Sequence, residues 1–216
     1  MTEEIIERLK GAVLSGDIEG AEEWAKRSLE LKLDPAQVIQ DGLIGGIKKV
    51  GEDFGRGILY LPELVASAEA CKAGSTILEE EIKQRGGQWK PVGTLVIGTV
   101  WGDIHDIGKT LVSTFFKASG FNVIDLGVNV PKENFIDAVR THKPEILALS
   151  SLLTTTIMEQ KYVMDALKES GLRSGVKTLV GGGVVTAKWA TEIGADGYGE
   201  NAQEAVAMAK TLLGVE

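Results

Sequence analysis

The side chains best suited to chemistry lie in one short segment, residues 102–109, with the sequence Gly-Asp-Ile-His-Asp-Ile-Gly-Lys (the motif loop). It places the imidazole of His105 between the carboxylates of Asp103 and Asp106. A neutral histidine can bind a metal through one ring nitrogen while the other donates to a carboxylate, which fixes the tautomer and raises ligand basicity. Asp103 has the chemistry for that partner. An exposed loop histidine with solvated acidic neighbours is the alternative that this segment alone leaves open.

Two nucleotide-binding motifs do not fit the motif loop. A dinucleotide-binding fingerprint needs G-x-G-x-x-G, and only Gly108 is in place. A P-loop needs G-x-x-x-x-G-K-[ST]; Gly108, Lys109 and Thr110 supply its end, but its first glycine would fall at Asp103. The segment therefore offers an imidazole where those motifs offer a phosphate cradle.

Two further segments hold small or polar residues that could meet a ligand. Hydroxyl side chains are concentrated in residues 150–156, and three consecutive glycines occupy residues 181–183. Thr155 and Thr156 could instead cap the next helix. The glycines could form a plain turn, and they also permit a close approach of backbone to a ligand.

The elements that must position these segments are predicted from residue 92 onward, where apolar runs alternate with amphipathic helical patterns. Strands are expected at residues 92–100, 122–126, 145–150, 176–180 and 196–198. Helices are expected at about residues 108–119, 131–141, 156–170, 186–193 and 201–213. Continuous apolar strands alternating with helices indicate a parallel sheet covered on both faces. The pattern predicts a doubly wound, five-stranded Rossmann-like or flavodoxin-like domain over residues 89–216, with its ligand at the carboxyl ends of the strands.

The first 88 residues carry only helical patterns, so the fold class is α followed by α/β. Four helices are predicted, beginning near Thr2, Asp17, Asp34 and Leu61. Asp34 is followed by a proline at the first helical position, which is a strong start signal. Short connections predict a four-helix bundle over residues 1–88, joined to the second domain by a linker at residues 86–90.

Composition excludes several classes of protein. The 216 residues include 23 Lys and Arg against 31 Asp and Glu, a net charge of −8, which argues against a nucleic-acid partner. No apolar run reaches the roughly 18 residues of a membrane span, and the acidic N-terminus lacks the pattern of a secretory signal. One cysteine, Cys71, excludes an internal disulfide framework. We expect a cytoplasmic protein with neither nucleic-acid nor membrane partners.

Taken together, the three loop segments resemble the signature of cobalamin-binding domains, D-x-H-x-x-G, S-x-L and G-G. The matching residues are Asp103, His105 and Gly108, then Ser150 and Leu152, then Gly181 and Gly182. Both long spacings fall where that family places them. The helical half resembles the cap of corrinoid methyltransferase proteins in residues 50–55 and 60–65. The chain is most similar to the small corrinoid proteins of methanogen and acetogen methyl-transfer systems, and also resembles the matching module of methionine synthase.

The resemblance implies a cobalamin bound base-off and His-on, in which the nucleotide tail leaves the cobalt and threads into the α/β domain. His105 would then be the metal-binding residue, the axial ligand of cobalt. Asp103 would bond its other ring nitrogen and Ser150 would bond Asp103, so that these three form the candidate catalytic set. Methylcobalamin favours a basic axial ligand and the Co(I) form loses it. The three-residue relay would therefore couple coordination to redox state.

The resemblance also implies which residues contact the cofactor. In the motif loop these are Gly102, Ile104, Asp106, Ile107 and Gly108 together with the axial pair. Leu152 and Thr154 would flank the lower-base pocket, and Gly181, Gly182 and Gly183 would line the groove for the nucleotide tail. Phe54 and Leu61 would cover the upper, methyl-bearing face of the corrin. The alternative for Leu152, Phe54 and Leu61 is that they are ordinary core residues.

The function implied is a corrinoid methyl carrier, a subunit of a methyltransferase system rather than a self-sufficient enzyme. A substrate-specific methyltransferase would load the methyl group and a second one would pass it to a thiol or a pterin; a corrinoid reductive activator would be a further partner. The alternatives are the cobalamin-binding subunit of an adenosylcobalamin-dependent mutase, against which the helical half argues, and a cobalamin-sensing regulator, which would need a DNA-binding segment. A flavodoxin-like domain without corrinoid would leave the three-part spacing unexplained.

Overall fold

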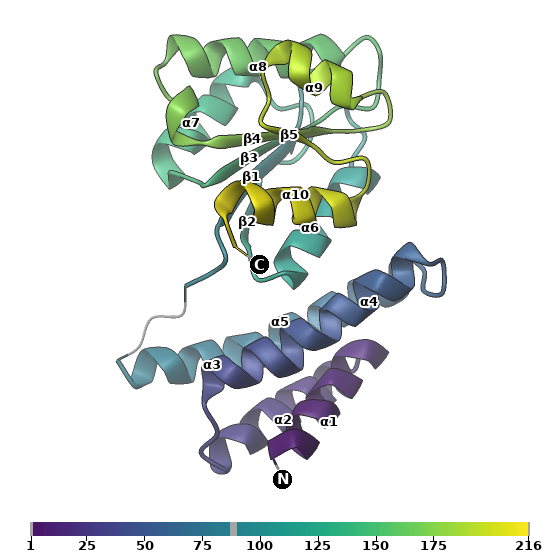
Figure 1. The fold of residues 1–216 in the computed structure, drawn as a ribbon, viewed down its shortest axis with the longest axis vertical. Helices are drawn as coiled ribbons and strands as arrows, with labels where there is room; N and C mark the ends of the chain where they lie inside the picture. The colour runs from purple at the N-terminus through teal and green to yellow at the C-terminus, as the bar shows by residue number, and fades with distance from the viewer. Residues whose placement is uncertain (1, 87–89, 216) are drawn as a thin grey trace. The chain divides into compact units, whose positions relative to one another are not determined.

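The computed structural model describes residues 2–86 and 90–215, and the chain divides near Lys90 into two compact units (Figure 1). The first unit is helical and the second contains the sheet. The linker expected at residues 86–90 falls largely on residues 87–89, which lie outside the described residues. None of the described helices is long and apolar enough to cross a membrane.

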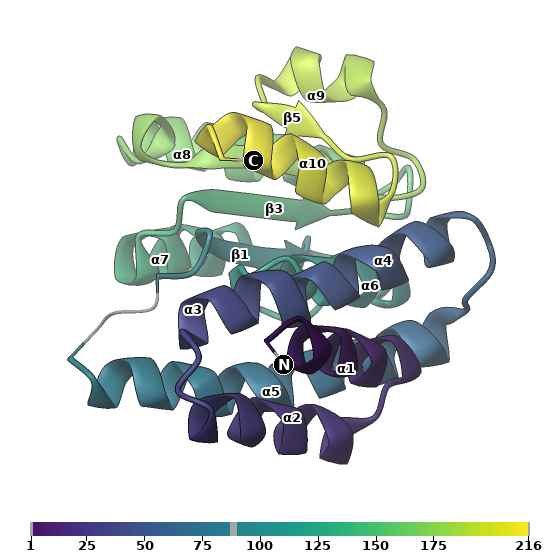
Figure 2. The ribbon, with the colours of Figure 1, turned by 60° about the horizontal axis from the view of Figure 1, so that its bottom comes forward.

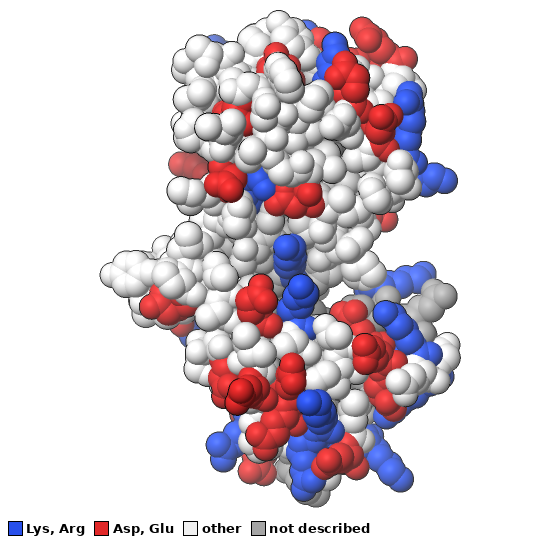
Figure 3. Space-filling model, turned by 180° about the vertical axis from the view of Figure 1, so that it is seen from behind, with Lys and Arg blue, Asp and Glu red and all other residues white. Residues whose placement is uncertain are grey.

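The helical unit is built from amphipathic helices that bury one face each. Its elements are α1 (Thr2–Ser15), α2 (Ile18–Glu30), α3 (Pro35–Val38), η1 (Ile39–Ile44), α4 (Gly45–Gly55) and α5 (Leu61–Gln84). As expected, Asp17 and Asp34 are N-caps: their carboxylates accept from the backbone N–H of Gly20 at 2.9 Å and of Ala36 at 3.2 Å. The core between the helices includes Leu9, Val13, Leu43, Leu64 and Leu78, all buried. Acidic and basic side chains are intermixed over the surface of this unit (Figure 3).

The third predicted helix is present, but its middle turn is wider than expected. Elements α3, η1 and α4 form one helical run in which η1 is a π-helix. Here the backbone packs closely on α1, since a Cβ on Gly42 would lie 2.8 Å from the side chain of Leu9. A π-helical turn accommodates an extra residue without ending the helix. Ile39, Leu43 and Ile47 recur every four residues, a spacing that an ordinary α-helix satisfies, so the sequence did not reveal the wide turn.

The second unit is a five-stranded parallel sheet in the order β2-β1-β3-β4-β5. Its strands are β1 (Thr94–Thr99), β2 (Asn122–Asp125), β3 (Ile146–Ser150), β4 (Lys177–Gly181) and β5 (Gly197–Tyr198). Its helices are α6 (Ile107–Ala118), α7 (Lys132–His142), α8 (Ile157–Glu169), α9 (Ala187–Ile193) and α10 (Ala202–Leu213), with the short 3₁₀ turn η2 (Arg173–Gly175) before β4. Helices α7, α8 and α9 cover one face and α6 and α10 the other (Figures 1 and 2). The predicted doubly wound fold is confirmed, in its flavodoxin-like strand order.

Strand alternation decides which side chains face which layer. Val96, Leu147, Leu149 and Val180 point into the core under α7, α8 and α9, where they meet Phe135. The intervening residues of each strand therefore face α6 and α10. Because strand order reverses between β1 and β3, the loops that follow these two strands leave the sheet at the switch point, where this fold class binds ligands.

Candidate functional site

The motif loop is fastened to the end of β1 by several hydrogen bonds. The hydroxyl of Thr99, the last residue of β1, donates to the carbonyl of His105 at 3.0 Å. The backbone N–H of Gly102 donates to the side chain of Asn129 at 2.8 Å, and the backbone N–H of Asn129 donates to the carbonyl of Asp103 at 2.9 Å. The loop is thereby held at the carboxyl end of the strand before α6 begins.

Lys109, the last residue of the motif loop, lies in the first turn of α6 and fixes it to β2. Its side chain is buried, and its Nζ donates to Oδ1 of Asp125, at the end of β2, at 2.6 Å. The same carboxylate oxygen accepts from the backbone N–H of Gly127 at 2.9 Å. Lys109 belongs to the Gly-Lys-Thr segment that partly matches a P-loop, but in the structure it forms an ion pair with Asp125 inside this unit.

The structure brings His105 and Asp103 into direct contact. Nδ1 of the imidazole lies 2.7 Å from Oδ1 of Asp103, and the backbone N–H of His105 donates to the same oxygen at 3.0 Å. The Asp103 side chain is fully buried, whereas the His105 side chain is 46% exposed. With Nδ1–H committed to the carboxylate, Nε2 is left as the acceptor nitrogen of an exposed ring. This is the arrangement that a histidine metal ligand requires.

The second oxygen of Asp103 is bonded from the segment that follows β3. Oδ2 accepts from the backbone N–H of Leu152 at 2.7 Å and from the hydroxyl of Thr156 at 3.0 Å. Burial acts to raise the pKa of Asp103, but the hydrogen bonds from Leu152, His105 and Thr156 outweigh it and lower the pKa to about 2. The carboxylate is therefore ionised at neutral pH and accepts a hydrogen bond from Nδ1–H of the imidazole.

The hydroxyl that bonds Asp103 is that of Thr156, not the one expected at Ser150. Within the described residues, the hydrogen bonds to the Asp103 carboxylate come from His105, Leu152 and Thr156. Strand alternation explains the difference: Leu149 points into the core under α7 and α8, so Ser150 points to the opposite face of the sheet. The sequence shows several hydroxyl side chains in residues 150–156, but it does not show which hydroxyl points toward Asp103.

The three glycines after β4 support the loop after β3. Gly182 has φ +122°, and a Cβ there would overlap the carbonyl oxygen of Ser151 and lie 2.6 Å from its carbonyl carbon. The backbone N–H of Ser151 donates to the carbonyl of Gly181 at 3.1 Å. A Cβ on Gly183 would lie 2.7 Å from the side chain of Leu152. The three signature segments therefore lie together at the carboxyl ends of β1, β3 and β4.

The surroundings of His105 are apolar and exposed. Trp101 is 51% exposed, Ile104 73% and Ile107 74%, and smaller exposed apolar surfaces are contributed by Val128, Leu152 and Leu153. Thr154 is exposed as well. Exposed apolar clusters of this kind mark binding surfaces in soluble domains. One acceptor nitrogen within an apolar rim fits a flat, largely apolar ring that carries a metal at its centre.

The first turns of α6 have room for a further part of such a ligand. A Cβ on Gly108 would meet no atom within 4 Å, so the space beside this residue is open. The hydroxyl of Ser113, on the same helix, is buried and lacks a hydrogen-bond partner within the described residues. An unpaired buried hydroxyl is unusual in a folded domain. The donor set and this space both suit a corrinoid with an extended tail.

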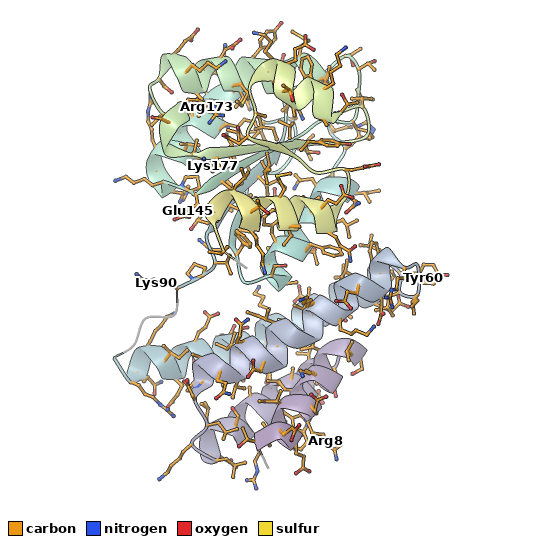
Figure 4. All side chains as sticks on the ribbon, in the orientation of Figure 1. Arg8, Tyr60, Lys90, Glu145, Arg173 and Lys177 are labelled. Atoms are coloured by element: carbon orange, nitrogen blue, oxygen red, sulfur yellow. The ribbon has the colours of Figure 1, made fainter. Side chains whose placement is uncertain are left out.

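The two predicted contact residues of the helical unit lie on either side of the turn between α4 and α5. Phe54 is half-buried near the end of α4, and Leu61 is exposed at the first position of α5. Between them Ile58 and Tyr60 are strongly exposed, with Tyr60 at the tip of the turn (Figure 4). The turn therefore carries an exposed apolar surface of its own.

Comparison with known proteins identifies the family. Profiles of the B12 binding domain match residues 93–207 and, for a second such domain, residues 5–79. This chain belongs to the B12-binding corrinoid proteins. Its cofactor is accordingly a corrinoid of the cobalamin type, and the residues described above fit it.

Full-length relatives include a trimethylamine corrinoid protein of Methanosarcina barkeri, 46% identical over 213 residues (99% of this chain and 98% of that protein). A dimethylamine corrinoid protein of Methanosarcina mazei is 44% identical over 214 residues, again covering 98% of both chains. Among solved structures, the methanol:cobalamin methyltransferase complex of Methanosarcina barkeri contains a chain that matches with a TM-score of 0.88 and 32% identity, over 99% of this chain and 81% of that one. The corrinoid-protein architecture is thus shared from end to end of the described residues.

Proposed function

We propose that this corrinoid protein is a methyl carrier. Its bound corrinoid supplies the group-transfer chemistry: cobalt accepts a methyl group at one methyltransferase and releases it at another, to a thiol or a pterin. Support comes from the similarity over almost the whole chain to corrinoid proteins named for methylated amines, and from the likeness to a chain of a methyltransferase complex. The protein acts as one subunit of such a system rather than as a self-sufficient enzyme.

The observation that carries the proposal is the buried Asp103 beneath an exposed His105. We assign His105 Nε2 as the atom that would bind the cobalt of a corrinoid held base-off. Asp103 holds the opposite nitrogen at 2.7 Å and, being ionised, keeps the imidazole in the tautomer that presents a lone pair outward. Without that acceptor, the ring could rotate or carry its proton on the wrong nitrogen.

The remaining site residues exclude water and shape the pocket. Ile104, Ile107 and Leu152, which are exposed, would offer apolar surface to a bound corrinoid. The open space beside Gly108 and the backbone at residues 181–183 would receive the nucleotide tail, and Thr154 would lie near the lower base. We assign residues 1–88 as the helical-bundle cap domain, from which Phe54 and Leu61 would be corrinoid contacts. Residues 89–216 form the corrinoid-binding domain.

We assign a methylated amine as the source of the methyl group. Relatives named for trimethylamine and dimethylamine share 44–46% identity with this chain over nearly its full length, whereas the chain from the methanol system shares 32%. The direct partner is then a methyltransferase specific for a methylated amine. A thiol- or pterin-methylating enzyme receives the group, and a reductive activator rescues oxidised cofactor.

The test is anaerobic reconstitution followed by a methyl-transfer assay. Wild-type protein and His105→Ala are loaded with cobalamin, desalted and examined by visible absorption; we expect a base-off, histidine-ligated spectrum in the wild type only. Each loaded protein is then offered trimethylamine, dimethylamine or methanol with the corresponding purified methyltransferase. Loading from a methylamine supports the proposal. Loss of the corrinoid during desalting would overturn the carrier function, and loading from methanol alone would overturn the amine assignment.

A further inference from the structure

We infer that Gln160 of α8, together with Trp189 of α9, is a positioning residue for the nucleotide tail of the bound corrinoid. The two side chains hold both ends of residues 182–186 (the β4–α9 loop), which include Gly182 and Gly183. This inference rests on the proposed function, because it takes the glycines after β4 as the place where the nucleotide tail binds.

The side chain of Gln160 is fully buried and uses both ends of its amide. Nε2 donates to the carbonyl of Leu149 at 2.9 Å and to the carbonyl of Gly181 at 3.2 Å. Oε1 accepts from Nε1–H of Trp189 at 3.0 Å. Because an indole N–H can only donate and a carbonyl can only accept, these partners fix which end of the amide faces which neighbour. All three hydrogen bonds therefore have a determined direction.

Two of these bonds brace the end of the β3–β4 pair. Leu149 is the next-to-last residue of β3, and Gly181 is the last residue of β4. The carbonyl of Gly181 also accepts from the backbone N–H of Ser151 at 3.1 Å. Directly after it, the backbone of Gly182 lies so close to Ser151 that a Cβ would overlap the carbonyl oxygen of that residue. The amide of Gln160 therefore fixes the point at which the β4–α9 loop begins.

The third bond fixes the end of the loop. Trp189 lies in the first turn of α9, and the N-cap residue Thr186 accepts from its backbone N–H at 3.2 Å. The Trp189 ring packs against the core under α7, α8 and α9. Helices α8 and α9 lie on the same face of the sheet (Figure 1), so the indole N–H reaches Gln160. One buried amide thus ties the residue before the β4–α9 loop to the helix after it.

The predicted effect concerns the nucleotide tail and not the axial ligand. A loop rich in glycine has few side chains of its own to hold its shape, so its position depends on the anchors at its ends. The motif loop has separate anchors, since His105 is bonded by Thr99 and Asp103. Removing the Gln160 amide should therefore displace the β4–α9 loop and leave histidine ligation intact.

The experiment measures two affinities for each full-length protein: that for cobalamin and that for cobinamide, which has the corrin ring and cobalt but lacks the nucleotide tail. Gln160→Met keeps the length of the side chain and removes all three bonds. Trp189→Phe keeps an aromatic ring and removes only the donor to Gln160. The matched control is Gln40→Met, at an exposed position of the helical unit. Corrinoid is titrated anaerobically and followed by visible absorption, and thermal unfolding of the corrinoid-free proteins shows whether each variant folds.

A further readout separates the tail from the axial ligand. Electron paramagnetic resonance of the Co(II) protein gives the fraction of cobalt that shows a nitrogen splitting from histidine (the histidine-ligated fraction), with His105→Ala as the zero point. We expect Gln160→Met to weaken cobalamin binding severalfold and Trp189→Phe to weaken it less. Cobinamide affinity and the histidine-ligated fraction should stay at the wild-type level in both. The double variant should bind cobalamin no more weakly than Gln160→Met, because Trp189 acts through Gln160.

The outcomes distinguish this inference from the proposed function. A folded Gln160→Met protein with unchanged cobalamin affinity, or with equal losses for cobalamin and cobinamide, would overturn the inference alone. If Gln160→Met does not fold, Trp189→Phe decides by the same criteria. A wild-type protein that binds cobinamide as tightly as cobalamin would likewise overturn only the inference, because the tail would then contribute nothing. A wild-type protein that retains neither corrinoid would overturn both.

Discussion

The motif loop of the α/β unit and the turn between α4 and α5 in the helical unit both expose apolar side chains, yet they are built in opposite ways. The motif loop is centred on a buried ionised carboxylate that gathers donors from His105, Leu152 and Thr156. The α4–α5 turn is closed by helix-end backbone bonds, such as that from the N–H of Ile58 to the carbonyl of Asp53 at 2.9 Å.

The two regions differ in how precisely their side chains must be oriented for the roles proposed above. A metal ligand has to be fixed in orientation and protonation, and buried hydrogen bonds do this at a cost in desolvation that only a complete network repays. A shielding surface needs only apolar area in roughly the right place. We therefore expect the motif loop to be sensitive to single polar atoms, and the α4–α5 turn to tolerate substitution.

The largest effect is expected from Asp103→Asn. The amide keeps one acceptor oxygen, but its NH₂ group must face the hydrogen-bond donors of Leu152 and Thr156, or else that of His105. Leaving buried donors unpaired and removing the charge should destabilise the corrinoid-free protein by about 3 kcal/mol and abolish histidine ligation. Urea unfolding and the visible spectrum of the loaded protein measure the two effects. A loss below about 1 kcal/mol would show that the network is weaker than its geometry indicates.

Two glycine substitutions in the α/β unit distinguish a glycine that packs against the protein backbone, Gly182, from one that lies beside open space for a ligand, Gly108. Gly182→Ala should cost about 2–4 kcal/mol, because the new Cβ meets the backbone of Ser151 at a positive φ. Gly108→Ala should leave stability within about 0.5 kcal/mol, since the site is open, but weaken corrinoid binding by filling the space. Thermal unfolding and corrinoid titration report the two quantities. Equal stability losses at both positions would remove the distinction.

The α4–α5 turn should behave differently. Leu61→Ala removes an exposed side chain and should change stability by less than about 0.5 kcal/mol, with histidine ligation unaffected. If Leu61 shields the upper face, bound methylcobalamin should be photolysed faster in the variant under constant illumination. The exposed Leu14 of α1, substituted in the same way, is the control. A change in the histidine-ligated fraction at Leu61 would contradict the separation of roles.

The smallest expected effect is a difference between the two units in how their stability changes as the pH is lowered. Burial acts to raise the pKa of Asp196, but hydrogen bonds from Thr178 and the charge of Arg173 outweigh it, and the pKa is lowered. A lowered native pKa contributes stability above the unfolded value, about 3.9, that is lost as pH falls below it. In the helical unit, burial raises the pKa of Glu79, although the charge of Lys83 acts to lower it. Protonation of Glu79 in mild acid therefore favours the folded state of the helical unit.

Hydrogen exchange by mass spectrometry between pH 7 and pH 3 tests this difference after correction for intrinsic rates. Peptides from β4 and β5 should lose protection before peptides from α5. The variant Asp196→Asn should show a shallower loss across the same range. If both units lost protection from exchange at the same pH, or if Asp196→Asn lost protection as steeply as the wild type, Asp196 would not be the source of the acid sensitivity.

The sequence was sufficient for the parts of the site that are local. Asp103 and His105 lie two residues apart in a turn, so their contact follows from spacing, and the alternation of apolar runs with helices predicted the doubly wound sheet. The partner of Asp103 was not local. Whether Ser150 or Thr156 reaches the carboxylate depends on which face of the sheet the end of β3 presents, and this is fixed only when the strand is packed.

The π-helical turn was missed for a similar reason. Ile39, Leu43 and Ile47 keep a four-residue apolar spacing that an α-helix satisfies, and the close packing of Gly42 on Leu9 appears only in three dimensions. Likewise, the exposure of Trp101 beside the motif loop could not be distinguished from core packing by composition.

The measurement that tests the central claim most directly is electron paramagnetic resonance of the Co(II) protein labelled with ¹⁵N-histidine. The chain has two histidines, and His142 at the end of α7 serves as an internal control through a His142→Gln variant. If His105 is the axial ligand, labelling converts the triplet nitrogen splitting to a doublet, in the wild type and in His142→Gln alike. A triplet that survives labelling would mean that the cofactor's own base stays on cobalt, and the account of Asp103 and His105 given above would be wrong.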